Sequence, residues 1–147
     1  MIEKLNINDI KEASEVYNKG LQMEVPKGYS TLKNTIKKLK KLQTFVYKEN
    51  KKIKGLISFK IDKNNIYLSF ICALPLRKGI GKKLMKKVAE FAIENNTKNI
   101  FSSVSYQDKK AMKFYEKLGF EKYDKKTDKD FTLFLIKVKP EKILNSF

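Results

Sequence analysis

The stretch Leu74-Pro75-Leu76-Arg77-Lys78-Gly79-Ile80-Gly81-Lys82 closes one apolar run and opens a lysine-edged helix, and it decides the fold. The first turn of a helix carries unpaired backbone N–H groups and the positive end of the helix dipole. Lys82 and Lys83 on that turn are poorly placed unless an anion lies among them. Glycine lets the backbone approach such an anion closely. Arg77 is the only arginine among 33 Lys and Arg residues, and its planar guanidinium suits two-point binding of phosphate. The stretch therefore predicts a phosphate-binding turn.

The composition indicates one globular domain and excludes several kinds of site. The chain has 147 residues, of which 41% are hydrophobic, and this length sustains a core. It contains no histidine and one cysteine, Cys72. Triads based on His, zinc sites built on His, internal disulfides and cysteine metal clusters are therefore excluded. We expect no metal, and any proton transfer must use Tyr, Asp, Glu, Lys, Ser, Cys72 or water.

The formal charge of +17 bears on partners and location. Clustered cations favour nucleic acid, but lysine here is spread over every segment, so no specific nucleic-acid partner is predicted. The charge instead raises the local concentration of anionic ligands. The N-terminus has no signal-peptide pattern, and no apolar run approaches the roughly 20 residues that span a bilayer. We expect a cytoplasmic protein without a membrane partner, and a homodimer stays open.

Hydrophobic periodicity and turn residues predict an α+β fold with a mixed sheet and helices on both faces. The expected elements are strand 1–7, a helix capped by Asn8 or Asp9, loop 24–29, a helix capped by Ser30, strands 44–48, 53–61 and 66–74 in an antiparallel meander, a helix to about 95, strand 99–104, a helix capped by Asp108, and strands near 123 and over 131–138. Gly119 fits a left-handed residue after the last helix, with Phe120 folding back on Phe114 or Tyr115.

Two segments, Ala73–Gly81 and Asp108–Phe120, occur about thirty residues apart in a familiar order of elements. The first resembles the acetyl-CoA pyrophosphate loop of the GCN5-related N-acetyltransferase (GNAT) superfamily. The second is similar to the family's late helix and its tyrosine-bearing end. The N-terminal 65 residues match in layout alone. The resemblance implies a single GNAT-like domain over 1–147, in three α/β/α layers, with a central, mostly antiparallel sheet that splays at the acetyl-CoA site.

The resemblance also implies an activity and its ligands. The chain would be an acyltransferase that uses acetyl-CoA as co-substrate and acetylates a primary amine, of a small molecule or a protein N-terminus, by direct attack on the thioester. The alternatives are a GNAT-fold module that binds CoA without turnover, or a basic protein that contacts RNA. The implied cofactor-binding residues are Cys72, Ala73, Leu74, Arg77, Lys78, Gly79, Ile80, Gly81, Lys82, Asp108 and Tyr115.

Two positions depart from the family pattern. Leu76 stands where the family has Arg or Gln, and Arg77 comes one place later, so the cation that contacts the pyrophosphate stays open. Asp108 stands where the family commonly has Asn. An aspartate caps a helix well, but its carboxylate donates no hydrogen bond to a cofactor.

Three catalytic roles follow from the resemblance. Tyr115 is the candidate general acid, because a phenol with an ordinary pKa of about 10 keeps its proton for a departing thiolate. A backbone N–H near Ala73 or Leu74 would stabilise the oxyanion. The base stays open: Glu24 lies on the loop between the first two helices, whereas Ser69 or Tyr67 would act through water. Periodicity alone favours a structural role for Tyr115 in the core.

Overall fold

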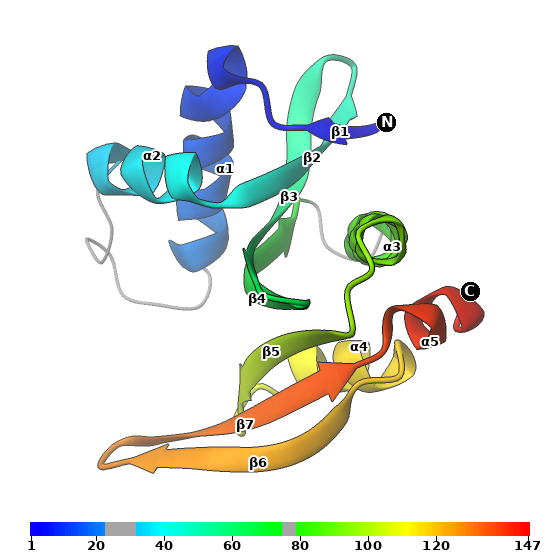
Figure 1. Ribbon diagram of the computed structural model, residues 1–147. Helices are drawn as coiled ribbons and strands as arrows, with labels where there is room; N and C mark the ends of the chain where they lie inside the picture. The colour runs from blue at the N-terminus through cyan, green and yellow to red at the C-terminus, as the bar shows by residue number, and fades with distance from the viewer. Residues whose placement is uncertain (23–31, 75–78) are drawn as a thin grey trace. The chain divides into compact units, whose positions relative to one another are not determined.

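A computed structural model describes residues 1–22, 32–74 and 79–147 (Figure 1). Its strands are β1 (Ile2–Lys4), β2 (Gln43–Glu49), β3 (Lys52–Asp62), β4 (Asn65–Ala73), β5 (Asn99–Ser105), β6 (Glu121–Asp128) and β7 (Phe131–Val138). Its helices are the 3-10 turn η1 (Ile7–Asp9) and α1 (Ile10–Gln22), α2 (Leu32–Lys41), α3 (Ile80–Glu94), α4 (Lys109–Lys117) and α5 (Pro140–Asn145). The strands form one sheet in the order β1-β2-β3-β4-β5-β7-β6. The β4–β5 pair is parallel and the pairs β1–β2, β2–β3, β5–β7 and β6–β7 are antiparallel, which confirms the predicted α+β class with a mixed, mostly antiparallel sheet.

Contacts between Cα atoms divide the chain into two compact units. Unit 1 comprises Met1–Lys60 and Ser69–Lys87, and unit 2 comprises Ile61–Leu68 and Val88–Phe147. The division therefore runs through β3, β4 and α3, so that each unit contains part of these three elements. Glu24 and Ser30, which the sequence assigned to a loop and a helix cap, lie outside the described residues, as do Pro75 to Lys78.

The start of unit 1 differs from the sequence expectation. The first strand ends at Lys4, and Asn6 rather than Asn8 or Asp9 caps the first helical turn. The Asn6 side-chain oxygen accepts a hydrogen bond from the Asn8 backbone N–H at 2.9 Å. This bond turns the chain into η1 before α1 begins, because a short polar side chain satisfies an N–H that the helix leaves without a partner.

The core of unit 1 is built by α1, α2 and the strands β2 and β3. Ala13 and Tyr17 of α1 and Leu39 of α2 pack with Val46 and Leu56. Thr35 is also buried, which the apolar pattern of α2 did not predict. Its hydroxyl donates to the Asn18 side-chain oxygen at 2.6 Å, and this hydrogen bond offsets the cost of burying a polar group.

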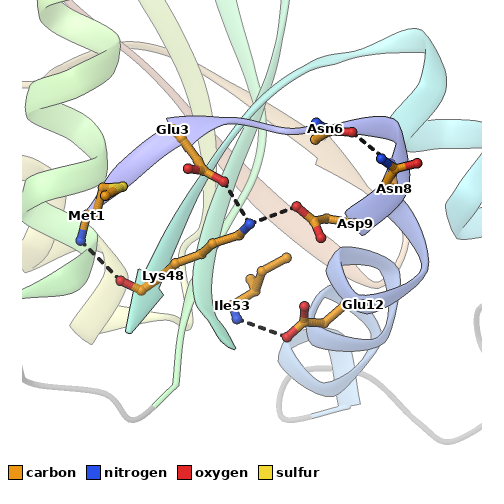
Figure 2. A network of polar contacts seen from close by, with 8 residues as sticks. All are labelled: Met1, Glu3, Asn6, Asn8, Asp9, Glu12, Lys48 and Ile53. Carbon is orange, nitrogen blue, oxygen red and sulfur yellow. Dashed lines mark hydrogen bonds and ion pairs between the residues drawn. The ribbon is translucent and has the colours of Figure 1, made fainter. Parts of the chain in front are cut away.

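Lys48 of β2 holds the N-terminal strand and turn against the sheet. Its ammonium lies 2.7 Å from a carboxylate oxygen of Glu3 and 2.7 Å from one of Asp9 (Figure 2). These contacts, led by the hydrogen bond with Asp9, raise the pKa of Lys48 above its ordinary value of 10.5. In the same region the Glu12 carboxylate accepts from the Ile53 backbone N–H at 3.0 Å (Figure 2). The network therefore ties β1, η1 and α1 to β2 and β3.

Replacing Lys48 by methionine should give a stability loss that depends on pH. Because the folded-state pKa lies above the unfolded value of 10.5, the ammonium's contribution is complete below that pH and is lost as pH rises through the folded pKa. Urea unfolding at pH 7 to 11.5 should show a gap between wild type and Lys48→Met that narrows above pH 10.5. The exposed Lys60→Met serves as the control, and a gap of constant size would show that the ion pairs contribute nothing.

Unit 2 contains the helix that the sequence predicted best. The Asp108 carboxylate accepts from the Ala111 backbone N–H at 3.0 Å, as expected of the cap of α4. Gly119 has φ +98°, and the Phe120 ring packs edge-on against Tyr115 with 5.1 Å between ring centroids. The left-handed glycine and the folded-back aromatic ring are confirmed, and together they end α4 and turn the chain into β6.

Two elements of unit 2 were predicted poorly or not at all. All eight residues of β6 are exposed, and its sequence shows no alternation of apolar and polar residues that would mark a strand. Antiparallel pairing with β7 holds β6 in place. The short helix α5 begins at Pro140 without a side-chain cap and is held by the buried Pro140 and Ile143. Six residues are too few for a helical period to stand out.

Candidate functional site

The predicted phosphate-binding turn lies at the start of α3 in unit 1. Gly79 has φ +73°, a left-handed conformation that favours glycine. Its carbonyl accepts from the Lys83 N–H at 3.1 Å, so Gly79 is the residue that caps the helix. A Cβ atom built on Gly79 would meet no described atom within 4 Å. No described atom therefore fills the position beside the first-turn N–H groups of α3, and Lys82 and Lys83 are exposed next to them.

Packing against β3 fixes where α3 begins. A Cβ atom on Gly55 would lie 2.8 Å from Cγ2 of Ile80 and 2.9 Å from the carbonyl oxygen of Cys72. Ile80 is 2% exposed, and it is the first residue of α3. Gly55 therefore lets β3, the end of β4 and the first turn of α3 approach closely. Gly55 was not singled out from the sequence, although a glycine inside a strand pattern signals close backbone approach.

Gly55→Ala should destabilise unit 1 and also weaken the CoA binding that the resemblance implies. Overpacking a tight contact costs about 1–3 kcal/mol, and the displaced atoms here belong to the residue that starts α3. We expect a lower midpoint in urea and a several-fold higher Kd for CoA by calorimetry. Lys54→Ala, the neighbouring position of β3, is the control. A folded Gly55→Ala protein with unchanged CoA affinity would show that this packing does not position the turn.

The last two residues of β4, Cys72 and Ala73, and the following Leu74 form the second part of the candidate site. The Leu74 backbone N–H donates to the Lys54 carbonyl at 2.6 Å, so it is committed to β3. Backbone groups of successive strand residues point to opposite edges, which directs those of Ala73 away from β3. The parallel register between β4 and β5 runs from Asn65 with Asn99 to Tyr67 with Phe101, while β4 continues to Ala73.

The remaining predicted residues of β4 lie on both faces of the strand. Ser69 is exposed and shares a face with Tyr67, which is 41% exposed, because side chains two apart in a strand point the same way. Cys72 is half-buried in unit 1, and its thiol lies 3.9 Å from the Val16 carbonyl oxygen. Cys72 therefore packs against α1 as a small hydrophobic residue does, which agrees with a structural role.

Tyr115 lies on α4 in unit 2 and is 7% exposed. Its ring makes edge contacts with Phe114 and Phe120, at centroid distances of 5.3 Å and 5.1 Å. The expected packing role of this ring is thus present, and it fixes the direction of the side chain. Tyr115 and Asp108 lie at opposite ends of α4, because Asp108 caps its first turn. Glu24, Arg77 and Lys78 lie outside the described residues.

Two other kinds of site are absent from the described residues. No group of three or more Cys, Asp or Glu side chains in residues 1–22, 32–74 and 79–147 is placed to hold a metal ion. No helix in this part of the chain is both long and apolar enough to cross a bilayer.

Comparison with known proteins places the chain in a family. The sequence profile of the acetyltransferase (GNAT) domain matches residues 12–136. The fold is similar to PaiA N-acetyltransferase from Thermoplasma acidophilum, solved with coenzyme A, at TM-score 0.77 and 21% identity over 95% of this chain and 98% of that one. It is also similar to ribosomal-protein-alanine N-acetyltransferase from Brucella melitensis, at TM-score 0.78 and 16% identity over 94% and 98%. A GNAT acetyltransferase from Streptococcus pneumoniae matches at TM-score 0.76 and 18% identity over 94% and 97%. This chain belongs to the GNAT family of acetyltransferases.

Proposed function

We propose that the protein transfers the acetyl group of acetyl-CoA to a primary amine, of a small molecule or a protein N-terminus, by direct attack of the amine on the thioester. The observation that carries the proposal is the left-handed Gly79 that opens α3 in a chain of this family. The proposal takes residues 1–147 as one acetyltransferase domain that acts in the cytoplasm. It requires neither a metal nor a nucleic-acid partner, and it fits a monomer or a homodimer.

The start of α3 suits the pyrophosphate of the co-substrate. Gly79, Ile80, Gly81 and Lys82 would bind it through backbone N–H groups, which are fixed dipoles aimed at an anion. The space beside Gly79 fits this assignment, because no described atom lies where a side chain would stand. Arg77 and Lys78 precede these residues in the sequence and are proposed to add positive charge. Asp108 is proposed to act through its cap of α4, which sets the direction of that helix.

The end of β4 would bind the pantetheine arm. The backbone groups of residues 72–74 that face away from β3 lie beyond the last β4–β5 partner, Tyr67, and are proposed to pair with the arm. Since Leu74 gives its N–H to Lys54, we assign the oxyanion donor to Ala73. A donor in this position commonly contributes ~10²–10³ in rate.

The chemistry requires one base and one acid. The amine nitrogen forms a bond to the carbonyl carbon, the carbon–sulfur bond breaks, and the thiolate leaves. We assign the proton for that thiolate to the Tyr115 hydroxyl, on the resemblance of the Asp108–Phe120 segment. The base that receives the amine proton is Glu24, or Ser69 or Tyr67 acting through water.

An amine panel tests the proposal. Purified protein with acetyl-CoA should release thiol when supplied with at least one of phenethylamine, spermidine, free amino acids and short peptides. Release should depend on both substrates. If CoA binds by calorimetry while every amine leaves the thioester intact, the protein is a CoA-binding module without this activity. If CoA does not bind and an oligonucleotide does, the RNA-contacting alternative replaces the proposal.

A further inference from the structure

Gly20 lies inside helix α1, two residues before its last residue, Gln22. Glycine in the interior of a helix is less favourable than alanine, because it loses more backbone freedom on folding. Gly20 is also buried, so no solvent stands in the place of a side chain. A buried helical glycine of this kind needs a packing reason.

The packing reason is a close contact between α1 and β4. A Cβ atom on Gly20 would lie 2.8 Å from Cβ and 3.2 Å from Sγ of Cys72, and 3.0 Å from Cζ of Phe70. Cζ of Phe70 is the far end of a side chain, whereas Cβ of Cys72 is bonded to the backbone and moves only with it. Gly20 therefore lets α1 lie directly on the strand at Cys72.

The neighbours of Gly20 hold α1 against β4. Tyr17, three residues earlier, is 2% exposed, and its ring centroid lies 4.0 Å from that of Phe70. Its hydroxyl accepts a hydrogen bond from Nζ of Lys38 in α2 at 2.8 Å. Because close-packed interiors yield little, a side chain at position 20 would displace the end of β4.

A second glycine limits the same peptide group at the β3 edge of the strand. The Cys72 carbonyl oxygen lies 2.9 Å from the position of a Cβ atom on Gly55, so this carbonyl points toward β3. A trans peptide group is planar, and the Ala73 N–H therefore points the opposite way, away from β3. The peptide group between Cys72 and Ala73 is thus packed against α1 at Gly20 and against β3 at Gly55.

We propose that Gly20 is a positioning residue for acetyl transfer. By letting α1 lie on Cys72, it holds the peptide group whose Ala73 N–H meets the developing oxyanion. This inference rests on the proposed function, which assigns that donor, and all of these residues belong to unit 1. The donor acts only within hydrogen-bond distance of the oxyanion, so a small displacement of β4 lowers the rate more than the affinity for CoA.

Gly20→Ala tests the proposal, because alanine favours a helix and any loss reports the contact with β4. We use acetyl-CoA and the amine of the panel that turns over fastest. The single-turnover rate should fall about tenfold, while the Kd for CoA by calorimetry should change less than about threefold. The Ala73 amide should shift in NMR spectra of protein labelled with isotopic alanine. Lys19→Ala, at the exposed neighbouring position of α1, is the matched control and should change neither rate nor Kd.

Rescue separates positioning from a general loss of stability. Cys72→Gly removes both Cys72 atoms that a Cβ atom on Gly20 would meet. In the Cys72→Gly background, adding Gly20→Ala should therefore change the single-turnover rate by less than about twofold. Circular dichroism checks that each variant is folded. If Gly20→Ala does not fold, Cys72→Val narrows the same contact from the strand side and should give the same loss of rate.

Each contrary outcome is distinct from failure of the proposed function. A wild-type single-turnover rate in folded Gly20→Ala would overturn the positioning role while acetyl transfer stands. An equal loss of rate in the Cys72→Gly background would also overturn it, because the loss would not arise from this contact. If the wild type binds CoA and acetylates no amine, the proposed function fails and the Ala73 amide decides whether Gly20 positions the peptide group. A shift in Gly20→Ala beyond that in Lys19→Ala would then support the positioning, and an equal one would overturn it.

Discussion

Tyr115→Phe should lower the single-turnover rate of acetyl transfer by ~10²–10³, the scale for loss of a general acid. Phenylalanine keeps the ring that packs against Phe114 and Phe120, so the fold should survive with a loss of about 1 kcal/mol or less from the missing hydroxyl. KM for acetyl-CoA should change little, because the lost interaction develops only in the transition state. Single-turnover rates are the right comparison, since product release limits many steady-state rates.

A second tyrosine separates loss of the acid from a general effect of removing a hydroxyl. Tyr106→Phe removes an exposed hydroxyl of unit 2 and should leave the single-turnover rate and CoA affinity unchanged. If Tyr115→Phe also transfers acetyl at the wild-type rate, Tyr115 has a packing role alone and water protonates the thiolate.

Gly81→Glu should abolish binding of CoA. The substitution adds bulk and a negative charge in the first turn of α3, where backbone N–H groups and the helix dipole are proposed to hold the pyrophosphate. Calorimetry should give no measurable affinity for CoA with this variant. The wild-type affinity should fall only moderately as salt rises, because fixed backbone dipoles are screened less than flexible surface lysines.

The control for this variant carries the same change of charge elsewhere. Asn64→Glu lies in the exposed turn between β3 and β4 and should bind CoA as the wild type does. Wild-type affinity in Gly81→Glu would mean that the pyrophosphate binds at another place in the protein.

The parts of the fold that the sequence predicted well are those with a local physical signal. The cap at Asp108 and the left-handed Gly119 were predicted because each follows from the chemistry of a few adjacent residues. The helix α3 was predicted to within about one residue of its end, because its buried stripe recurs over fifteen residues. The turn at Gly79 was predicted from a few adjacent residues too, namely its two glycines and the cations beside them.

The features that the sequence missed depend on contacts between distant segments. Gly55 is tightly packed only because Ile80 and Cys72 approach it, and neither neighbour is evident from the surrounding β3 residues. Thr35 is buried because Asn18 of another helix accepts its hydrogen bond. The ring contacts of Phe101 with Tyr67 and Tyr123 were also missed, because the three residues come from separate strands and the register of β6 shifts next to Tyr123.

The catalytic assignments rest on two kinds of observation. We assign the oxyanion donor to Ala73 rather than Leu74, because the Leu74 backbone N–H already donates to the Lys54 carbonyl of β3. The acid and the base rest on the resemblance alone. A sequence cannot fix which carboxylate or hydroxyl meets a substrate when the candidates come from different elements, as Glu24, Ser69 and Tyr115 do.

The most direct test of direct acetyl transfer follows isotope-labelled acetyl-CoA by mass spectrometry, with and without an amine that the panel has identified. We expect the label to appear on the nitrogen of the amine. We also expect intact protein of unchanged mass when the amine is left out, because direct attack forms no acyl-enzyme. Labelled protein in the absence of amine, with the acetyl group on Cys72, would contradict direct transfer. Absence of labelled amine, from protein that binds CoA, would contradict the acetyltransferase activity itself.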